Sequence, residues 1–181
     1  MQYPTLYTKR LILRPFNKSD AARVQFLAGD KEIATTTLNI PYPYPDGLAE
    51  EWIATHAEDF ARNRSVIFAI CLKEDKKLIG AIGLTLAHQH DHAELGYWIG
   101  VPYWNNGYCT EAAQEVLNYG FAYLGLNRIF AQYLEKNDAS GRVMQKLGMK
   151  PEGELRLHLK HWGSYHNIIV YGILKDEFLQ A

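Results

Sequence analysis

The segment from Pro102 to Ala112 has the residue types of an anion-binding turn. Its sequence is Pro-Tyr-Trp-Asn-Asn-Gly-Tyr-Cys-Thr-Glu-Ala, and it joins a predicted strand to a predicted helix. The first N–H groups of such a helix have no intrahelical partner, and the positive end of the helix dipole lies at the turn. Phosphate commonly binds at this kind of junction, and Gly107 would let the backbone approach it because glycine has no Cβ. The same residues also suit an ordinary strand-to-helix turn, so the segment alone leaves both interpretations open.

Three basic residues extend the possible anion chemistry. Arg142, Lys146 and Lys150 are spaced at i, i+4 and i+8, a spacing that predicts one face of a helix. A second phosphate could bind along this stripe, although a solvated helix face has the same pattern.

Three alternating histidines and one cysteine could in principle bind a metal or act as a nucleophile, but we predict neither role. His88, His90 and His92 alternate, as transition-metal ligands on a strand would, but Gln and Asp separate them in a predicted hairpin turn. A solvated turn is the favoured interpretation, and no metal site is predicted. Cys109 has no His or Asp pattern beside it that would activate a thiolate nucleophile. We interpret it as a small residue at the start of a helix.

Apolar patterns predict the elements that must position these residues. Apolar residues at helical spacing predict helices over about 20–27, 47–62, 112–124 and 139–147. Alternating or continuous apolar runs predict strands over 11–14, 66–72, 78–85, 93–99, 129–134, 154–159 and 165–174. The Pro/Tyr-rich stretch 40–45 is predicted to be a loop, because each proline fixes φ and lacks a donor N–H. This order predicts an α+β fold, a mixed α/β sandwich in which a mostly antiparallel sheet carries helices on both faces.

Composition excludes several classes of protein. The chain has 181 residues, 48% of them hydrophobic, with 19 Lys and Arg against 20 Asp and Glu. That balance excludes intrinsic disorder and provides no field that would gather nucleic acid or an anionic membrane. No apolar run approaches the roughly 20 residues of a membrane span, and the N-terminus lacks the apolar core of a signal peptide. The length predicts a single domain over residues 1–181. Because the chain has only two cysteines and no CxxC pattern, we expect it to be reduced and cytoplasmic.

Several segments in the same order carry a resemblance to a known family. The loop Pro102–Ala112 and the segments 8–15, 93–98, 137–148 and 152–156 together resemble the GNAT superfamily of N-acetyltransferases. The resemblance is strongest to the Rim-type branch, which acetylates the N-termini of bacterial ribosomal proteins. The loop departs from the family pattern at its first position, where Trp104 stands, and at its last, where Cys109 stands. The branch also usually has Gly where this chain has Asn105.

The resemblance implies acetyl-CoA as the acyl-donor cosubstrate and predicts where it binds. The central strand would splay from the strand over 129–134, and the exposed backbone would pair with the pantetheine arm. The cofactor-binding residues implied in this way are Ile99, Gly100, Val101, Asn106, Gly107, Tyr108, Cys109, Thr110, Asn137, Arg142 and Lys146. The loop residues among them would hold the diphosphate, the two basic side chains the 3′-phosphate, and Asn137 the pantetheine.

The resemblance also implies the chemistry. A primary amine must be deprotonated to attack a thioester, and Glu94 is the predicted general base, acting directly or through water. Ser140 is predicted to protonate the departing thiolate, although a serine in a first helical turn can also be a backbone cap. Tyr42, Trp52 and Tyr97 are predicted walls of the acceptor site.

The acceptor is not fixed by these residues. A protein N-terminal α-amine is the first expectation, and a polyamine, an amino acid or an aminoglycoside is the second. A non-catalytic CoA-binding protein is the alternative outside enzymology. We expect no nucleic-acid or membrane partner, and either a monomer or a homodimer.

Overall fold

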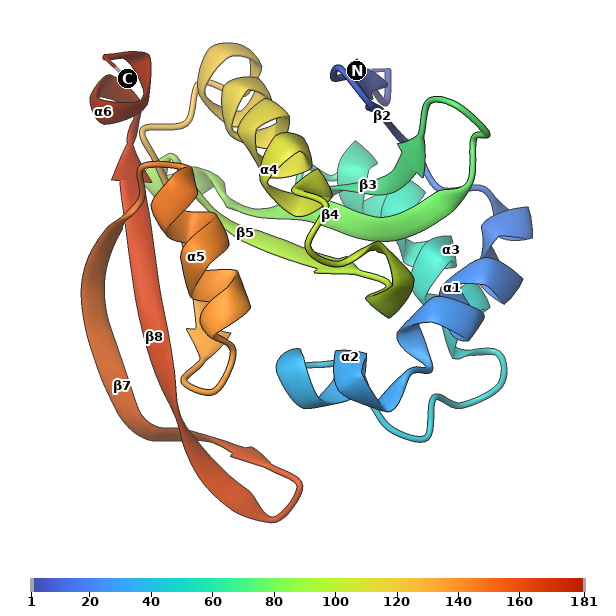
Figure 1. Cartoon of the computed structure of the whole chain (residues 1–181). Coiled ribbons are helices and arrows are strands. Elements are labelled where there is room, and N and C mark those ends of the chain that lie inside the picture. The colour runs from blue at the N-terminus through green and yellow to red at the C-terminus, as the bar shows by residue number, and fades with distance from the viewer. Residues whose placement is uncertain (1, 181) are drawn as a thin grey trace.

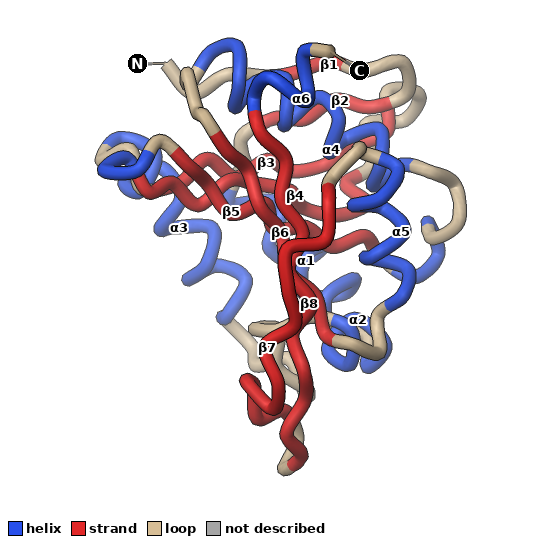
Figure 2. The backbone as a smooth tube through the Cα atoms, turned by 90° about the vertical axis from the view of Figure 1, so that its left-hand side faces the viewer, coloured by secondary structure: helices blue, strands red, loops and turns tan. Residues whose placement is uncertain are grey.

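The computed structural model describes residues 2–180 and contains one twisted eight-stranded sheet (Figures 1 and 2). The strand order is β1-β2-β3-β4-β5-β6-β8-β7. Every neighbouring pair is antiparallel except β5 and β6. The strands are β1 (Leu6–Tyr7), β2 (Leu11–Arg14), β3 (Ser65–Leu72), β4 (Leu78–Ala87), β5 (His92–Ile99), β6 (Arg128–Leu134), β7 (Lys150–His161) and β8 (Ser164–Leu174).

Helices cover both faces of this sheet, which confirms the predicted fold class. They are α1 (Ala21–Ala28), α2 (Lys31–Thr36), α3 (Leu48–Ala61), α4 (Tyr108–Asn118), α5 (Asp138–Lys146) and α6 (Lys175–Leu179). α4 and α5 pack on one face of the sheet, and α1 and α3 pack on the other (Figure 1). Among residues 2–180, no helix is both long and apolar enough to cross a membrane.

Each face of the sheet has its own apolar core because strand side chains alternate. Phe68 and Ile70 of β3 belong to the core that also contains α4 and α5. Ala69 and Cys71, the residues next to them, pack with α1 and α3 on the other face. This double burial explains why β3 is a continuous apolar run rather than an alternating one.

The two central strands separate part of the way along their length. β5 pairs with β6 only over His92–Glu94 and Arg128–Phe130. Beyond that point β5 stays paired with β4 as far as Ile99, and β6 stays paired with β8 as far as Leu134. A V-shaped gap therefore opens in the middle of the sheet, as the family resemblance predicts.

Short elements differ most from the predictions. The sequence pattern missed β1, α2 and α6, and it extended the helix of α4 through residue 124. The chain instead leaves α4 through a wider π-helical turn over Tyr119–Tyr123, which buries Tyr119 and Phe121 together. The strand predicted over 154–159 is also longer, because β7 begins at Lys150 and ends at His161.

Candidate active site

A cavity of about 830 Å³ passes through the gap between β5 and β6. Residues of α2 and α3 line it on one face of the sheet, and residues of α4 and α5 line it on the other. Two ligands could therefore meet at the gap from opposite faces. Following the prediction from the sequence, we call the α2/α3 side the acceptor half and the α4/α5 side the cofactor half.

Most of the predicted cofactor residues line the cofactor half. Those that line it are Ile99, Gly107, Tyr108, Cys109, Thr110, Asn137, Arg142 and Lys146. Gly100, Val101 and Asn106 do not line the cavity. The N–H of Gly100 donates to the carbonyl oxygen of Ile79 at 2.8 Å, so this N–H is not free to pair with a ligand. Val101 begins a 3-10 turn that leads away from the strand.

The turn before α4 has the backbone geometry of an anion cradle. Asn105 (φ 61°) and Gly107 (φ 75°) both occupy the left-handed region, which glycine and asparagine tolerate best. α4 begins at the next residue, Tyr108. The first N–H groups of α4 therefore lie beside the cavity without intrahelical partners. Together with Arg142 and Lys146, they provide donors and positive charge that fit a phosphorylated ligand such as CoA.

Only two of the three residues in the predicted basic stripe lie on α5. The helix ends near Gly148, whose φ of 76° a helix cannot continue through. Lys150 consequently begins β7 and forms an ion pair with Glu177 at 2.5 Å. The prediction that Lys150 shares a helix face with Arg142 and Lys146 is wrong.

Glu94 lies at the point where β5 and β6 separate. It is the last residue of β5 that pairs with β6, and it lines the cavity. Its Oε1 accepts a hydrogen bond from Gln132 Nε2 at 2.8 Å. Sequence reasoning missed Gln132, although a polar amide in the apolar strand Arg128–Leu134 was the available signal. The carboxylate is thus held at the meeting point of the two halves.

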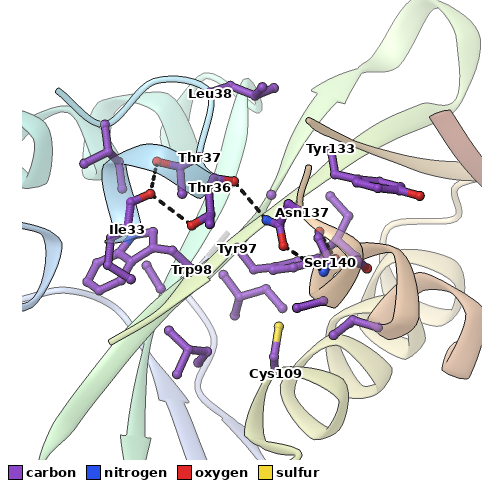
Figure 3. Close-up of a pocket in the computed structure, with 18 of the residues that line it drawn as sticks. Ile33, Thr36, Thr37, Leu38, Tyr97, Trp98, Cys109, Tyr133, Asn137 and Ser140 are labelled. Atoms are coloured by element: carbon purple, nitrogen blue, oxygen red, sulfur yellow. Dashed lines mark hydrogen bonds between the residues drawn. The ribbon is translucent and has the colours of Figure 1, made fainter. Parts of the chain in front are cut away.

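Ser140 and Tyr97 form a hydroxyl pair in the cofactor half (Figure 3). Ser140 is buried, and its Oγ lies 2.9 Å from the hydroxyl of Tyr97. Burial raises the pKa of Tyr97 far above the usual range, so its phenol stays protonated at neutral pH. Asn137 Oδ1, not the serine side chain, caps the helix by accepting from the Ser140 N–H at 3.1 Å. The serine hydroxyl is therefore available to the cavity.

The three residues predicted to form the acceptor walls lie in three different places in the structure. Trp52 lines the acceptor half as expected. Tyr97 points to the opposite face, toward α5, because side chains alternate along β5 and Glu94 and Trp98 occupy the acceptor face. Tyr42 is 46% exposed, does not line the cavity and lies 6.3 Å, ring to ring, from Trp162 at the β7–β8 hairpin. A wall missed by the sequence is α2, which contributes Ile33 and Thr36.

Asn137 also joins the two halves of the cavity. Its Nδ2 donates to the carbonyl oxygen of Thr36 at 2.9 Å, while its Oδ1 caps α5 (Figure 3). The end of α2 is therefore held against the start of α5, across the gap in the sheet.

Cys109 and the histidine group do not support nucleophilic or metal chemistry. Burial raises the pKa of the Cys109 thiol to about 12, so little thiolate exists at neutral pH. The His88 ring lies 2.5 Å from the carbonyl oxygen of Asn63, while His90 and His92 stack on each other. Across residues 2–180, no three His, Cys, Asp or Glu side chains converge as a metal site would require.

Comparison with known proteins decides the family. The family model of the acetyltransferase (GNAT) domain matches residues 10–150 of the sequence. The chain belongs to the GNAT family of acetyltransferases. It is 35% identical over 174 residues to the uncharacterized N-acetyltransferase YoaA of Bacillus subtilis, covering 96% of this chain and 98% of the relative. It is 27% identical over 167 residues to the spermidine N(1)-acetyltransferase of Escherichia coli K12, covering 92% and 87%.

A solved structure gives the same result for the fold. The ribosomal-protein-S5-alanine acetyltransferase of Vibrio fischeri superimposes with a TM-score of 0.84 at 21% identity, covering 97% of this chain and 98% of that one. Membership of the GNAT family makes this protein an acyltransferase, and acetyl-CoA is the acyl donor of that family. The family's use of an amine acceptor fits a cavity that is lined from both faces of the sheet.

Proposed function

We propose that the protein acetylates a primary α-amine, foremost the N-terminus of a protein, by direct attack within a ternary complex. The observation that carries the proposal is Glu94, held by Gln132 at the apex of a cavity that reaches both faces of the sheet. The resemblance to the ribosomal-protein branch also favours an α-amine. At neutral pH the α-amine of a protein N-terminus is deprotonated more often than a lysine side chain, because its pKa is near ~7.7 and that of lysine is near ~10.4. It is therefore the easier nucleophile to use.

The lining of the acceptor half favours an acceptor with a single positive charge. Its walls are mainly apolar or hydroxyl-bearing, from residues such as Ile33, Thr37, Ile40 and Trp52. Among the described residues that line the cavity, the carboxylates are Glu94 and Asp138, the latter at the start of α5. A polyamine carries several ammonium groups and needs several carboxylates to replace their water. The cavity offers few.

Each group of the site has one part in the proposed reaction. Bound acetyl-CoA supplies the thioester. Glu94 accepts the proton of the attacking amine, directly or through water. The Ser140 hydroxyl, held by Tyr97, donates a proton to the departing thiolate sulfur. The Asn105–Thr110 turn holds the diphosphate, and Arg142 and Lys146 hold the 3′-phosphate.

A peptide acetylation assay tests the proposal. The protein would be incubated with acetyl-CoA and peptides that begin with Ala or Ser and contain one lysine, with the same peptides blocked at the N-terminus, and with spermidine. CoA release and product mass would be measured. We expect one acetyl group on the free N-terminus and none on the blocked peptides. Acetylation of spermidine alone would replace the α-amine with a polyamine, the second candidate, which the spermidine acetyltransferase relative favours.

Three wider expectations belong to the same proposal. The two cysteines, Cys71 and Cys109, are both free thiols, which supports a reducing, cytoplasmic location. We also propose that residues 1–181 act as one domain, and that the protein works as a monomer or homodimer without nucleic acid.

A further inference from the structure

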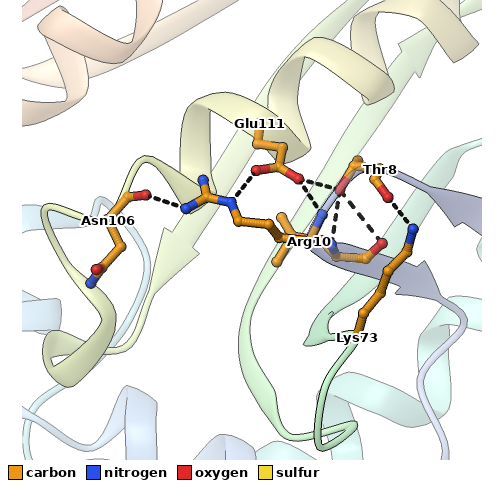
Figure 4. Close-up of polar contacts among 6 residues, drawn as sticks. Thr8, Arg10, Lys73, Asn106 and Glu111 are labelled. Carbon is orange, nitrogen blue, oxygen red and sulfur yellow. Dashed lines mark hydrogen bonds and ion pairs between the residues drawn. The ribbon is translucent and has the colours of Figure 1, made fainter.

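An arginine outside the cavity contacts the proposed phosphate turn from behind (Figure 4). Arg10 lies in the turn between β1 and β2, and its Nη1 donates to the carbonyl oxygen of Asn106 at 2.9 Å. Its guanidinium also lies 4.5 Å from the ring centroid of Tyr108, the first residue of α4. A Cβ on Gly107 would lie 3.6 Å from its Nη2. Arg10 therefore contacts or adjoins each residue of the turn from 106 to 108.

The same arginine pairs with a carboxylate in the first turn of α4. Glu111 accepts hydrogen bonds from the Arg10 N–H at 2.7 Å, from Arg10 Nε at 2.6 Å and from the Thr8 hydroxyl at 2.6 Å. Partial burial works to raise the pKa of Glu111, but these hydrogen bonds outweigh it and lower the pKa below its usual value. Glu111 is therefore ionised at neutral pH.

This arrangement matters because the turn is proposed to bind an anion. The carbonyl oxygen of Asn106 is partially negative, and the carboxylate of Glu111 is ionised. Asn106 belongs to the proposed phosphate turn and Glu111 to the first turn of the helix that follows it, although neither residue lines the cavity. An uncompensated negative group beside an anion-binding turn weakens anion binding. Arg10 engages both groups at once through two different nitrogens, Nη1 and Nε, of its planar guanidinium, a fork that a single ammonium nitrogen does not reproduce.

We propose that Arg10 is a positioning residue for the CoA diphosphate, one that fixes the turn and neutralises Glu111 without touching the ligand. The inference rests on the proposed function, which places the diphosphate on the Asn105–Thr110 turn. It adds a residue far from that turn in sequence, on the first hairpin of the chain.

The test compares two ligands that differ in the diphosphate. CoA affinity would be measured by calorimetry, and the affinity of pantetheine, which lacks the diphosphate and nucleotide, by NMR titration. The variants are Arg10→Gln, Arg10→Lys, Glu111→Gln and the double variant Arg10→Gln/Glu111→Gln. Lys9→Gln, at the exposed neighbouring position, is the matched control. Thermal unfolding would check that each variant is folded.

We expect Arg10→Gln to weaken CoA binding about tenfold, the equivalent of about 1.4 kcal/mol, and to leave pantetheine binding unchanged. Arg10→Lys should lose about threefold, because it keeps the charge but not the fork. The double variant should recover part of the affinity, since the unpaired carboxylate is gone but the contact with the Asn106 carbonyl oxygen is still missing. Glu111→Gln and Lys9→Gln should bind CoA nearly as the unmodified protein does.

Three results would overturn the inference about Arg10 alone, and a fourth would overturn the phosphate turn as well. Arg10→Gln could bind CoA normally, or it could lose CoA and pantetheine equally, which indicates a purely structural brace. The double variant could also fail to recover. If the unmodified protein does not prefer CoA to pantetheine, the phosphate turn itself is misassigned and the role of Arg10 falls with it.

Discussion

At the scale of single residues, the position of Glu94 makes the proposed base directly testable. Glu94→Gln keeps the shape of the side chain and can keep the contact with Gln132, but it cannot accept a proton. We expect turnover to fall by about 10²-fold or more, with CoA affinity unchanged. Steady-state kinetics and calorimetry would measure the two quantities. Glu74→Gln, in the exposed turn between β3 and β4, is the control; unchanged turnover in Glu94→Gln would place the base elsewhere.

The hydroxyl pair of Ser140 and Tyr97 supports a second prediction. Their oxygens are 2.9 Å apart, so either one could be the final proton donor. We expect Ser140→Ala to lower kcat by about 10–100-fold and Tyr97→Phe to lower it less, because the serine donates and the tyrosine orients it. A larger loss in Tyr97→Phe would reverse the two roles.

A buried histidine makes stability depend on pH. His56 is 4% exposed, packs edge-on against Phe16 and Trp52, and neither ring nitrogen has a hydrogen-bond partner among residues 2–180. Burial lowers its pKa from 6.5 to about 4, against a weaker opposing effect of Asp59. The unfolded chain therefore binds this proton more readily. Its contribution to stability is complete above pH 6.5 and is lost as the pH falls toward 4.

The expected loss from His56 is about 3 kcal/mol over that range. His56→Leu should remove this part of the pH dependence, and denaturant unfolding between pH 4 and pH 7 would measure it. His158→Gln, which changes an exposed histidine of β7, should leave the pH profile unchanged. A His56→Leu profile parallel to that of the unmodified protein would contradict the assignment.

At the scale of elements, the turn before α4 depends on the conformation of Gly107. A side chain there meets open space apart from Arg10, so the cost of substitution is the left-handed φ of 75° rather than a clash. We expect Gly107→Val to cost about 1–2 kcal/mol of stability and to weaken CoA binding about tenfold by moving the turn. Gly163→Val is the control, because Gly163 lies in a hairpin with φ 81° and open surroundings. It should lower the free energy of unfolding by a similar amount and leave CoA binding unchanged. Equal CoA affinity in both variants would refute the phosphate turn.

Elements were predictable from sequence where burial imposed a long regular pattern. The helix of α3 extends over enough turns to show its apolar face, and β3 and β4 are mostly buried apolar runs. β5 instead alternates buried Ala93 and Leu95 with less buried neighbours. α2 could not be found in this way, because it has six residues and only Ile33 and Ala34 are buried. Its start depends on Asp30, whose side chain accepts from the N–H of Glu32.

The candidate site was predictable where its chemistry follows local sequence. Glu94, Ser140 and the Gly107 turn were identified from segments that each form one element. Gln132 and Arg10 were missed because their partners lie 38 and 101 residues away. The pairing of β5 with β6 brings Gln132 to Glu94, and the packing of α4 near β2 brings Glu111 to Arg10. Tyr97 was assigned to the wrong face because the sequence did not indicate which face of β5 each ligand would approach.

At the scale of the whole molecule, the cavity that crosses the sheet predicts the order of the reaction. Residues from both faces of the sheet line the cavity, so donor and acceptor can be bound at the same time. Burial raises the pKa of the Cys109 thiol to about 12, which makes it a poor acyl carrier. We expect initial-rate lines that intersect when both substrates are varied, as a ternary complex requires. Parallel lines, or acetylated protein detected by mass spectrometry in the absence of acceptor, would indicate a covalent intermediate instead.

The gap between β5 and β6 is also a division of the chain into two stretches. Strands β1 to β5 all lie on one side of it and β6 to β8 on the other, and the chain passes from one side to the other once, through α4 and the turn that follows it. Most of the acceptor wall, from α2 and α3, belongs to the earlier stretch, whereas α5 belongs to the later one. Insertions between Gly29 and Arg62 can therefore reshape the acceptor wall while leaving the strand pairing of the later stretch intact. In evolutionary terms, the proposed acceptor wall and the α5 part of the proposed donor site are free to diverge at different rates within one continuous sheet.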